Sequence, residues 1–493
     1  MTILPTLRHM QSCATLRPAP ASILHPLAQA FGVRTSEGGI GLELPDSRFR
    51  NQVVDVLRDL VRIDTTNPPG NETECARYLA RLLADAGIAT RISESIPGRG
   101  NLIARIPGSG EGKPLMFMGH LDVVSADPSE WQYPPFAAEV HDGFVWGRGT
   151  TDMKNMIAAC AVTMLALASL GQPLKRDLLF VATADEEHGG RHGMGWLTRE
   201  MPELFQVACA INEGGGKAIK VGDRLYYTCQ SAEKGICRTV WRAQAKGGHG
   251  AYPRQDTSTM KLSQALCELG DGHLRPHATD TMRTALRAIA GSHSEEAARR
   301  VDGLLESGQV EEAMVEAGFG ADDVVRHRAL FYDTASITSL RAGDPASINV
   351  IPAVATAYVD CRILPGQTRE GFLRLLRERA GGQVEIGLYA EQYSPGLESS
   401  TEAPIFRVIS QVIADHVEGA VVVPWQCAGS TDAKHLIRLG VPVYGFVPTN
   451  PLPDGMEGAG AHANNERVWI ENLHFSLQVL YEIAHRFCTQ PQQ

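Results

Sequence analysis

The chain has 493 residues, of which 43% are hydrophobic and 21% charged, and its formal net charge is −10. This composition is that of a globular protein, and the length exceeds what one hydrophobic core usually organises, so we expect two domains. The acidic balance argues against a nucleic-acid partner. The longest apolar run, Met156 to Leu170, is shorter than the roughly 20 residues of a membrane span, so it predicts a buried helix and no membrane partner.

Residues 1–45 differ from the rest of the chain because they contain several prolines and have no acidic residue before Glu37. We expect a disordered extension, and a targeting peptide is the alternative that these residues leave open. The ten cysteines are widely spaced and form no Cys-x-x-Cys pair. This spacing predicts reduced, mostly buried thiols. A cytoplasmic location is the expectation.

Helical spacing of apolar residues predicts two helices, at 49–61 and 75–83. Short continuous apolar runs then follow at 115–118, 178–181, 207–211 and 443–447. Such runs between helical segments predict an α/β fold whose mixed, mostly parallel sheet is flanked by helices. Ligands gather at the carboxyl ends of strands in such sheets, and His120, Glu187 and Glu213 each follow one of these runs.

A second pattern predicts an inserted α+β domain over residues 234–392. Its expected strands and helices lie at 236–245 (strand), 257–269 (helix), 335–340 (strand), 353–363 (strand), 368–379 (helix) and 384–389 (strand). This order is typical of a ferredoxin-like fold with one four-stranded sheet covered by helices on one side. Residues 276–330 predict extra helices. The catalytic domain would then comprise residues 46–233 and 393–493.

Five polar motifs carry the chemistry. They are Gly119-His120-Leu121-Asp122, Gly149-Thr150-Thr151-Asp152, Asp185-Glu186-Glu187, Asn212-Glu213-Gly214 and Ala461-His462-Ala463. Together they supply the imidazoles and carboxylates that a paired metal site with its own general base requires. In this order they resemble the dinuclear zinc amidohydrolases and metallopeptidases that include aminoacylases, glutamate carboxypeptidases, acetylornithine deacetylase and succinyl-diaminopimelate desuccinylase. The resemblance runs from about residue 46 to about residue 487.

The resemblance implies a ligand set. His120 and Glu213 would hold one divalent metal, Glu187 and His462 the other, and Asp152 would bridge the two. Zinc is the metal that the family implies, and cobalt or manganese would suit the same ligands.

Two further carboxylates lie beside these ligands. If the strand continues past His120, Asp122 points the same way and accepts the second ring N–H of that histidine. Glu186 and Glu187 are adjacent and cannot both face one metal, so Glu186 would be the general base. An acidic segment on a solvated loop is the alternative for these residues in isolation.

The resemblance also implies residues that face the substrate. His249, in Gly247-Gly248-His249-Gly250, is similar to a lid histidine that reaches the neighbouring subunit's active site and polarises the scissile carbonyl. This implies a homodimer through the inserted domain, and a plain turn histidine is the alternative. The substrate carboxylate would be bound by Arg362, Asn349, Gly429 and Ser430. An ion pair of Arg362 with Asp360 is the competing interpretation.

The expected function is metal-dependent hydrolysis of an amide bond in N-acyl amino acids or small peptides that bear a free carboxylate, as in aminoacylases and carboxypeptidases. A metal-bridging hydroxide would attack the amide, with Glu186 as base. A deacylase of the acetylornithine or succinyl-diaminopimelate type, a dipeptidase and a non-enzymatic binding or assembly protein are the alternatives. The chain lacks a His-Glu-x-x-His motif and a Gly-x-Ser-x-Gly elbow, which disfavours other common hydrolase designs.

Overall fold

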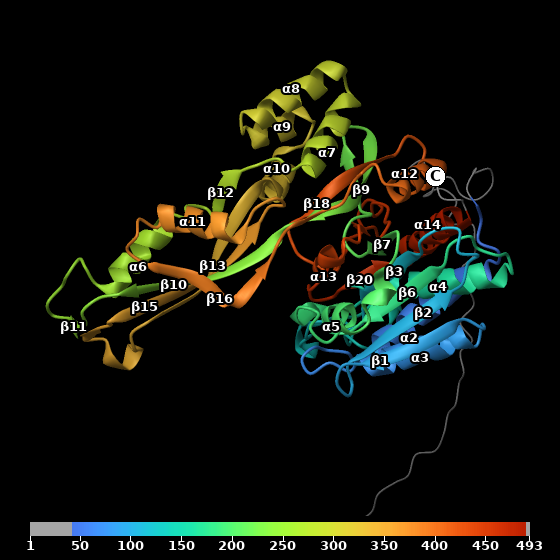
Figure 1. The fold of residues 1–493 in the computed structure, drawn as a ribbon, viewed down its shortest axis with the longest axis horizontal. Coiled ribbons are helices and arrows are strands. Elements are labelled where there is room, and N and C mark those ends of the chain that lie inside the picture. Colours follow the sequence, from blue (N-terminus) through green and yellow to red (C-terminus); the bar gives the residue numbers. More distant parts are fainter. Residues whose placement is uncertain (1–41, 490–493) are drawn as a thin grey trace, which may run out of the picture.

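The computed structural model describes residues 42–489, so nearly all of the extension expected at residues 1–45 lies outside the described residues. Figure 1 shows a large α/β body, built from both ends of the chain, and an elongated arm formed by its middle. Along the described residues, no helix combines the length and the apolar character needed to cross a membrane.

The body is organised around a ten-stranded sheet. Its main path has the order β1 (Ala89–Glu94), β2 (Gly100–Ile106), β6 (Leu178–Thr183), β3 (Leu115–His120), β7 (Cys209–Asn212), β19 (Val443–Gly445), β9 (Arg224–Glu233) and β17 (Leu397–Glu398). Strands β8 (Ala218–Val221) and β18 (Val421–Cys427) also pair with β9. The central strands β6, β3, β7 and β19 are parallel, whereas β1, β2, β8 and β17 pair antiparallel. The expected mixed sheet flanked by helices is confirmed.

Strand β3 shows why both faces of this sheet are apolar. Leu115 and Phe117 pack into one hydrophobic cluster, and Met116 and Met118 pack into another. Successive side chains of a strand point to opposite faces, so a continuous apolar run supplies both clusters. The first cluster includes residues of α2 (Arg48–Arg62), α3 (Glu72–Ala84), α4 (Lys154–Ser169), α12 (Pro404–His416) and α14 (Ile470–Thr489). The second includes residues of α5 (Met194–Glu200) and α13 (Ala433–Leu436).

Helix α4 is the buried helix expected from the apolar run near Met156. Nearly every residue of this helix is buried, including Lys154 at its first position. The Lys154 ammonium donates to the carbonyl oxygens of Leu60 and Ile63, both at 2.9 Å, and so satisfies carbonyls at the end of α2. The packing of α4 against the sheet fixes the loop that precedes it, which carries Asp152.

The arm contains the expected ferredoxin-like fold. Its antiparallel sheet has the order β12 (His273–Pro276), β13 (Tyr332–Ala342), β15 (Val354–Ile363), β10 (Gly235–Gln244) and β16 (Glu385–Ser394). One face packs against α6 (Ser258–Cys267) and α11 (Arg369–Arg379). The sheet has five strands rather than four, because β12 adds an edge strand. The sequence did not predict β12, since its four residues include few apolar ones.

The extra helices expected between residues 276 and 330 are α7 (Asp280–Gly291), α8 (Glu295–Glu306), α9 (Val310–Glu316) and α10 (Ala321–His327). Their apolar residues form a cluster with Tyr226 of β9 and Val423 of β18. These helices therefore extend the core beside the main sheet (Figure 1). The domain bounds at 46–233, 234–392 and 393–493 stay a prediction.

Candidate metal centre

The centre of the site is Asp152, whose two carboxylate oxygens face different histidines. His120 Nε2 lies 3.0 Å from Asp152 Oδ1, and His462 Nε2 lies 3.3 Å from Asp152 Oδ2. Two groups of potential metal ligands share this residue: His120, Asp152 and Glu213 form one, and Asp152, Glu187 and His462 form the other. Within each group the ligand atoms lie within 4.8 Å of one another. All five ligands expected from the sequence therefore converge.

The parallel strands explain most of this convergence. His120 is the last residue of β3, Glu213 directly follows β7, and Glu187 lies in the 3₁₀ helix Glu186–His188 that follows β6. The carboxyl ends of adjacent parallel strands meet at one edge of the sheet, so these side chains are neighbours. His462 enters from a loop before β20 (Arg467–Trp469), which pairs with β5 (Phe144–Trp146).

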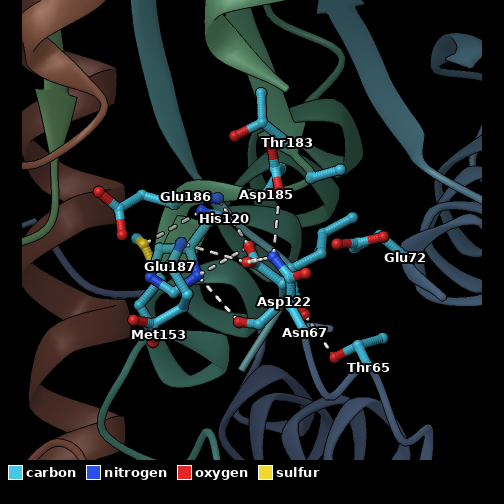
Figure 2. Close-up of polar contacts among 12 residues, drawn as sticks. Thr65, Asn67, Glu72, His120, Asp122, Met153, Thr183, Asp185, Glu186 and Glu187 are labelled. Atoms are coloured by element: carbon cyan, nitrogen blue, oxygen red, sulfur yellow. Dashed lines mark hydrogen bonds and ion pairs between the residues drawn. The ribbon is translucent and has the colours of Figure 1, made fainter. Parts of the chain in front are cut away.

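The contact between His120 and Asp122 differs from the expected one. Strand β3 ends at His120, and Nδ1 of that histidine lies 2.9 Å from the main-chain carbonyl oxygen of Asp122 but 3.5 Å from its carboxylate. A carbonyl oxygen only accepts, so Nδ1 carries a proton and Nε2 is the ring nitrogen left to bind a metal. The Asp122 carboxylate instead accepts the main-chain N–H groups of Glu186 (3.0 Å) and Glu187 (3.2 Å). Asp122 thus positions both the histidine and the two glutamates (Figure 2).

Asp185 shapes the turn that presents Glu186 and Glu187. It adopts a left-handed conformation with φ of 73°, which costs free energy for a residue with a side chain. Its carboxylate accepts hydrogen bonds from Asn67 (3.1 Å, Figure 2) and Arg99 (2.9 Å). Arg99 also pairs with buried Glu72. This buried network compensates for the strained turn. Sequence reasoning missed Asn67 and Arg99, since they lie 118 and 86 residues from Asp185 in the chain.

A buried ion pair holds the loop that carries Asp152. Glu466 pairs with Arg148, and both side chains are almost fully buried. The Glu466 carboxylate also accepts the main-chain N–H groups of Thr151 (2.6 Å) and Asp152 (3.1 Å). Arg148 and Glu466 lie within or next to two of the motifs, but nothing in the sequence pairs them.

We expect Glu466→Gln to lower the free energy of unfolding by about 3–5 kcal/mol, because it leaves Arg148 buried without its counter-charge. The amide of Gln at this position can no longer accept all the main-chain N–H groups that now bind the Glu466 carboxylate, so the loop that carries Asp152 loses support. Metal affinity should therefore fall by about 10- to 100-fold. Denaturant unfolding and metal titration measure the two effects. Glu203→Gln, at an exposed position, is the matched control. Wild-type stability in Glu466→Gln would contradict the assignment.

The donor set fits divalent cations. Burial raises the pKa of Glu187 to about 7 and that of Glu213 to about 8, so both carboxylates lie where a negative charge needs compensation. Burial acts in the same direction on Asp152, but hydrogen bonds from His120 and His462 outweigh it and hold the pKa of Asp152 low. Three carboxylates and two imidazoles of this kind suit zinc, cobalt or manganese.

Glu186 lies beside this cluster but belongs to neither ligand group. Its Oε1 lies 3.3 Å from Nζ of Lys434, and both side chains are 12% exposed. The same Nζ lies 4.0 Å from buried Asp432, which accepts a hydrogen bond from Thr183 at 3.0 Å. Sequence reasoning missed Lys434, because it lies 248 residues from Glu186 and no spacing connects them. Lys434 holds the side chain of Glu186 in one place.

We expect Lys434→Met to lower kcat by about 10- to 100-fold with the metal content and the unfolding midpoint unchanged, because Glu186 loses the group that orients it. Lys434→Arg keeps the charge and should recover part of this loss. Steady-state kinetics with metal analysis of both variants checks the prediction. Equal kcat values for Lys434→Met and the wild type would contradict it.

Two of the expected substrate-binding residues of the arm, His249 and Asn349, lie apart from the metal ligands of the same chain. His249 is on β11 (Gly248–His249), which pairs with β14 (Val350–Ile351), and Gly250 N–H donates to the Asn349 carbonyl at 2.6 Å. Figure 1 places β11 at the far end of the arm. Arg362 forms an ion pair with Asp360 at 2.8 Å, the competing interpretation of this arginine. The roles of His249, Asn349 and Arg362 stay predictions.

The loop that carries Gly429 and Ser430 is fixed from the main sheet. Fully buried Glu233, at the end of β9, accepts hydrogen bonds from the main-chain N–H (3.0 Å) and the hydroxyl (2.6 Å) of Thr431. Gly429 N–H points to the sulfur of Cys427 at 3.2 Å. The loop leads directly to Lys434 and thus borders the position of Glu186. A role of Gly429 and Ser430 in carboxylate binding stays a prediction.

Comparison with known proteins agrees with this geometry. N-fatty-acyl-amino acid synthase/hydrolase PM20D1 from Xenopus tropicalis is 24% identical over 462 residues, which cover 88% of this chain and 85% of that protein. Succinyl-diaminopimelate desuccinylase from Methylocella silvestris is 26% identical over 458 residues, or 90% of this chain and 99% of the relative.

A dinuclear metal-binding peptidase of the M20 family from Bacillus subtilis has the same fold. The two structures align with a TM-score of 0.58 at 16% identity, over 90% of this chain and all of the other. Residues 116–486 match the sequence model of Peptidase family M20/M25/M40. This match includes every expected metal ligand. The chain therefore belongs to Peptidase family M20/M25/M40 and is a metal-dependent hydrolase of amide bonds.

Proposed function

We propose that this enzyme cleaves the amide bond of an N-acyl amino acid or of a small peptide with a free carboxylate, using two metal ions held by His120, Asp152, Glu187, Glu213 and His462. The observation that carries the proposal is the position of Asp152, whose two oxygens face histidines of two ligand groups. Bound there, two divalent cations would polarise the amide carbonyl and make a nearby water more acidic. Zinc is our first choice of metal, because imidazole and carboxylate ligands suit it.

The chain's own contribution to the reaction centres on Glu186. Its carboxylate would accept a proton from the attacking water at the oxygen that does not face Lys434, and would then deliver this proton to the leaving amine. Lys434 orients the carboxylate, and Asp122 fixes its main chain. A base that belongs to neither ligand group can exchange protons without displacing a metal.

The arm would complete the site in a homodimer. Support comes from apolar side chains that are exposed on the arm, including Ile337, Leu340 and Tyr389. It also comes from the distance of β11 from the metal ligands of its own chain (Figure 1). His249 of one subunit would polarise the carbonyl at the metal centre of the other, while Arg362, Asn349, Gly429 and Ser430 would bind the substrate carboxylate.

Co-expression of His249→Ala chains with Glu186→Gln chains tests the dimer. Each variant alone should be nearly inactive, whereas the mixture should regain up to about a quarter of the wild-type sites, because half of the dimers then contain one complete site. Turnover of the co-purified mixture, with each variant alone as control, measures this recovery. A mixture no more active than its components would contradict catalysis across subunits.

A panel of substrates tests the proposed function. We expect hydrolysis of N-acyl amino acids or dipeptides by the metal-loaded enzyme, and loss of the rate when the free carboxylate is replaced by an amide. N-succinyl-diaminopimelate and N-acetylornithine represent the second candidate, which the desuccinylase relative favours. Equal rates for carboxylate and amide forms would contradict the proposed substrate class.

A cytoplasmic location is also proposed. It is supported by the thiols of the described cysteines, all of which are free and most of which are buried.

A further inference from the structure

A cavity of about 300 Å³ lies at the edge of the main sheet opposite the metal centre. Lys113, Arg176 and Cys209 line it, and they lie at the amino ends of β3, β6 and β7, respectively. These strands are parallel, and the metal ligands follow their carboxyl ends. Strand β3 has six residues, so at about 3.3 Å per residue roughly 17 Å separates the two edges. The cavity is therefore separate from the proposed active site.

Arg176 is the unusual group in this cavity. It is 7% exposed, and its Nε has no hydrogen-bond partner. Its guanidinium packs over the ring of Phe487, with 4.8 Å from Cζ to the centroid, and lies so close to Gly112 that a Cβ there would be 2.9 Å from Cζ. Among residues 42–489 no carboxylate forms an ion pair with it. A buried guanidinium without an acceptor is costly, so an anion in the cavity would stabilise it.

Two further features of the lining also lack a negative partner. Lys113 is exposed beside the cavity, and within the described part of the chain it forms no ion pair. Helix α12 begins at the cavity with Pro404 and Ile405, its N-cap residue Ala403 has no side chain that can cap it, and its first turn contains no acidic residue. The free N–H groups and the dipole at a helix N-terminus favour an anion.

The remaining lining residues define the rest of the ligand. Ala208, Cys209, Ala403, Ile405 and Phe487 present apolar surface. The nearby carboxylate of Asp177 is already engaged by Arg105 and by the Gly108 N–H at 2.7 Å, so it does not neutralise Arg176. We propose that this cavity binds a small carboxylate with a short apolar tail, its carboxylate against Arg176, Lys113 and the start of α12. The proposal does not depend on the amide substrate proposed above.

Titration of the full chain with 4,4,4-trifluorobutyrate, followed by ¹⁹F NMR, tests the site. We expect saturable line broadening that is retained in Asp152→Ala, where the metal centre is lost. Arg176→Met should weaken binding by at least about tenfold, because it removes charge-assisted hydrogen bonds from a buried group. Lys113→Ala should weaken it by about two- to fivefold, as expected for an exposed charge. Lys220→Ala, another exposed lysine, should bind like the wild type.

Several outcomes would overturn the site. The first is that no saturable broadening is seen. The second is that binding is lost in Asp152→Ala but kept in folded Arg176→Met. The third is that the uncharged trifluorobutyramide binds as tightly as trifluorobutyrate. Binding of inorganic phosphate without trifluorobutyrate would overturn the assignment of a carboxylate. If Arg176→Met does not fold, the affinities of Lys113→Ala and Lys220→Ala for trifluorobutyrate are compared instead. Equal affinities would show that the charge of Lys113 does not contribute to binding, and would overturn the proposed site.

Discussion

Replacing Glu186 with glutamine is expected to lower kcat by about 10²- to 10⁴-fold, the usual contribution of a general base, while the metal content stays that of the wild type. The amide occupies the same volume but cannot accept the proton of the attacking water. Glu186 belongs to neither metal-ligand group, and its contact to Lys434 is not a metal contact, so its loss leaves the five ligands in place. Single-turnover kinetics and metal analysis by mass spectrometry measure both quantities.

The adjacent carboxylate provides the sharpest control. Glu187→Gln should lose metal as well as activity, because Glu187 lies 3.1 Å from His462 Nε2 within a ligand group. Glu200→Gln, at an exposed position, should change neither. Near-normal turnover by Glu186→Gln with full metal content would reject Glu186 as the base. Metal loss in Glu186→Gln would instead make it a ligand.

Asp152→Ala is expected to show the largest loss, on the order of 10⁴-fold or more, since rate enhancements by enzymes begin near 10⁶ and this one depends on metal. Asp152 is the residue that both ligand groups share, so its removal weakens both metal sites together. Metal content should fall from two ions per chain to less than one. Removal of metal from the wild type by a chelator should give the same loss of activity, and added zinc should restore it only in the wild type.

An exposed acidic residue outside both ligand groups makes the comparison specific. Asp454→Ala changes an exposed carboxylate and should keep both metals and full activity. Retention of two ions by Asp152→Ala would show that Asp152 does not bridge, and activity that survives complete metal removal would reject the whole mechanism.

Sequence patterns predicted the elements that depend on local rules. The apolar runs predicted β3 and β6 because strands buried on both faces need apolar residues at every position. The run near Met156 predicted α4, and the order of elements predicted the ferredoxin-like arm. The edge strand β12 was missed, because its four residues carry little apolar signal.

The proposed ligand set also comes from the sequence, since five motifs with the required residue types occur in the order of a known family, and the structure brings these residues together. The residues that support these ligands could not be predicted from the sequence. The hydrogen bonds of Asp122 to Glu186 and Glu187, and the ion pair of Lys434 with Glu186, join segments that are far apart in the chain. No periodicity or spacing encodes such contacts, because they exist only after the strands have aligned.

The sequence by itself determined which groups we expect to perform the chemistry, because metals and proton transfer demand particular side chains that can be recognised one motif at a time. Only the tertiary structure decided how those groups are held. In the folded chain the Asp122 carboxylate accepts hydrogen bonds from the main-chain N–H groups of Glu186 and Glu187, and Arg362 forms an ion pair with Asp360. Nε of Arg176 is buried without a hydrogen-bond acceptor. Each of these contacts depends on which segments meet in space, because the partner of a buried charged group is set by the side chains that packing places next to it.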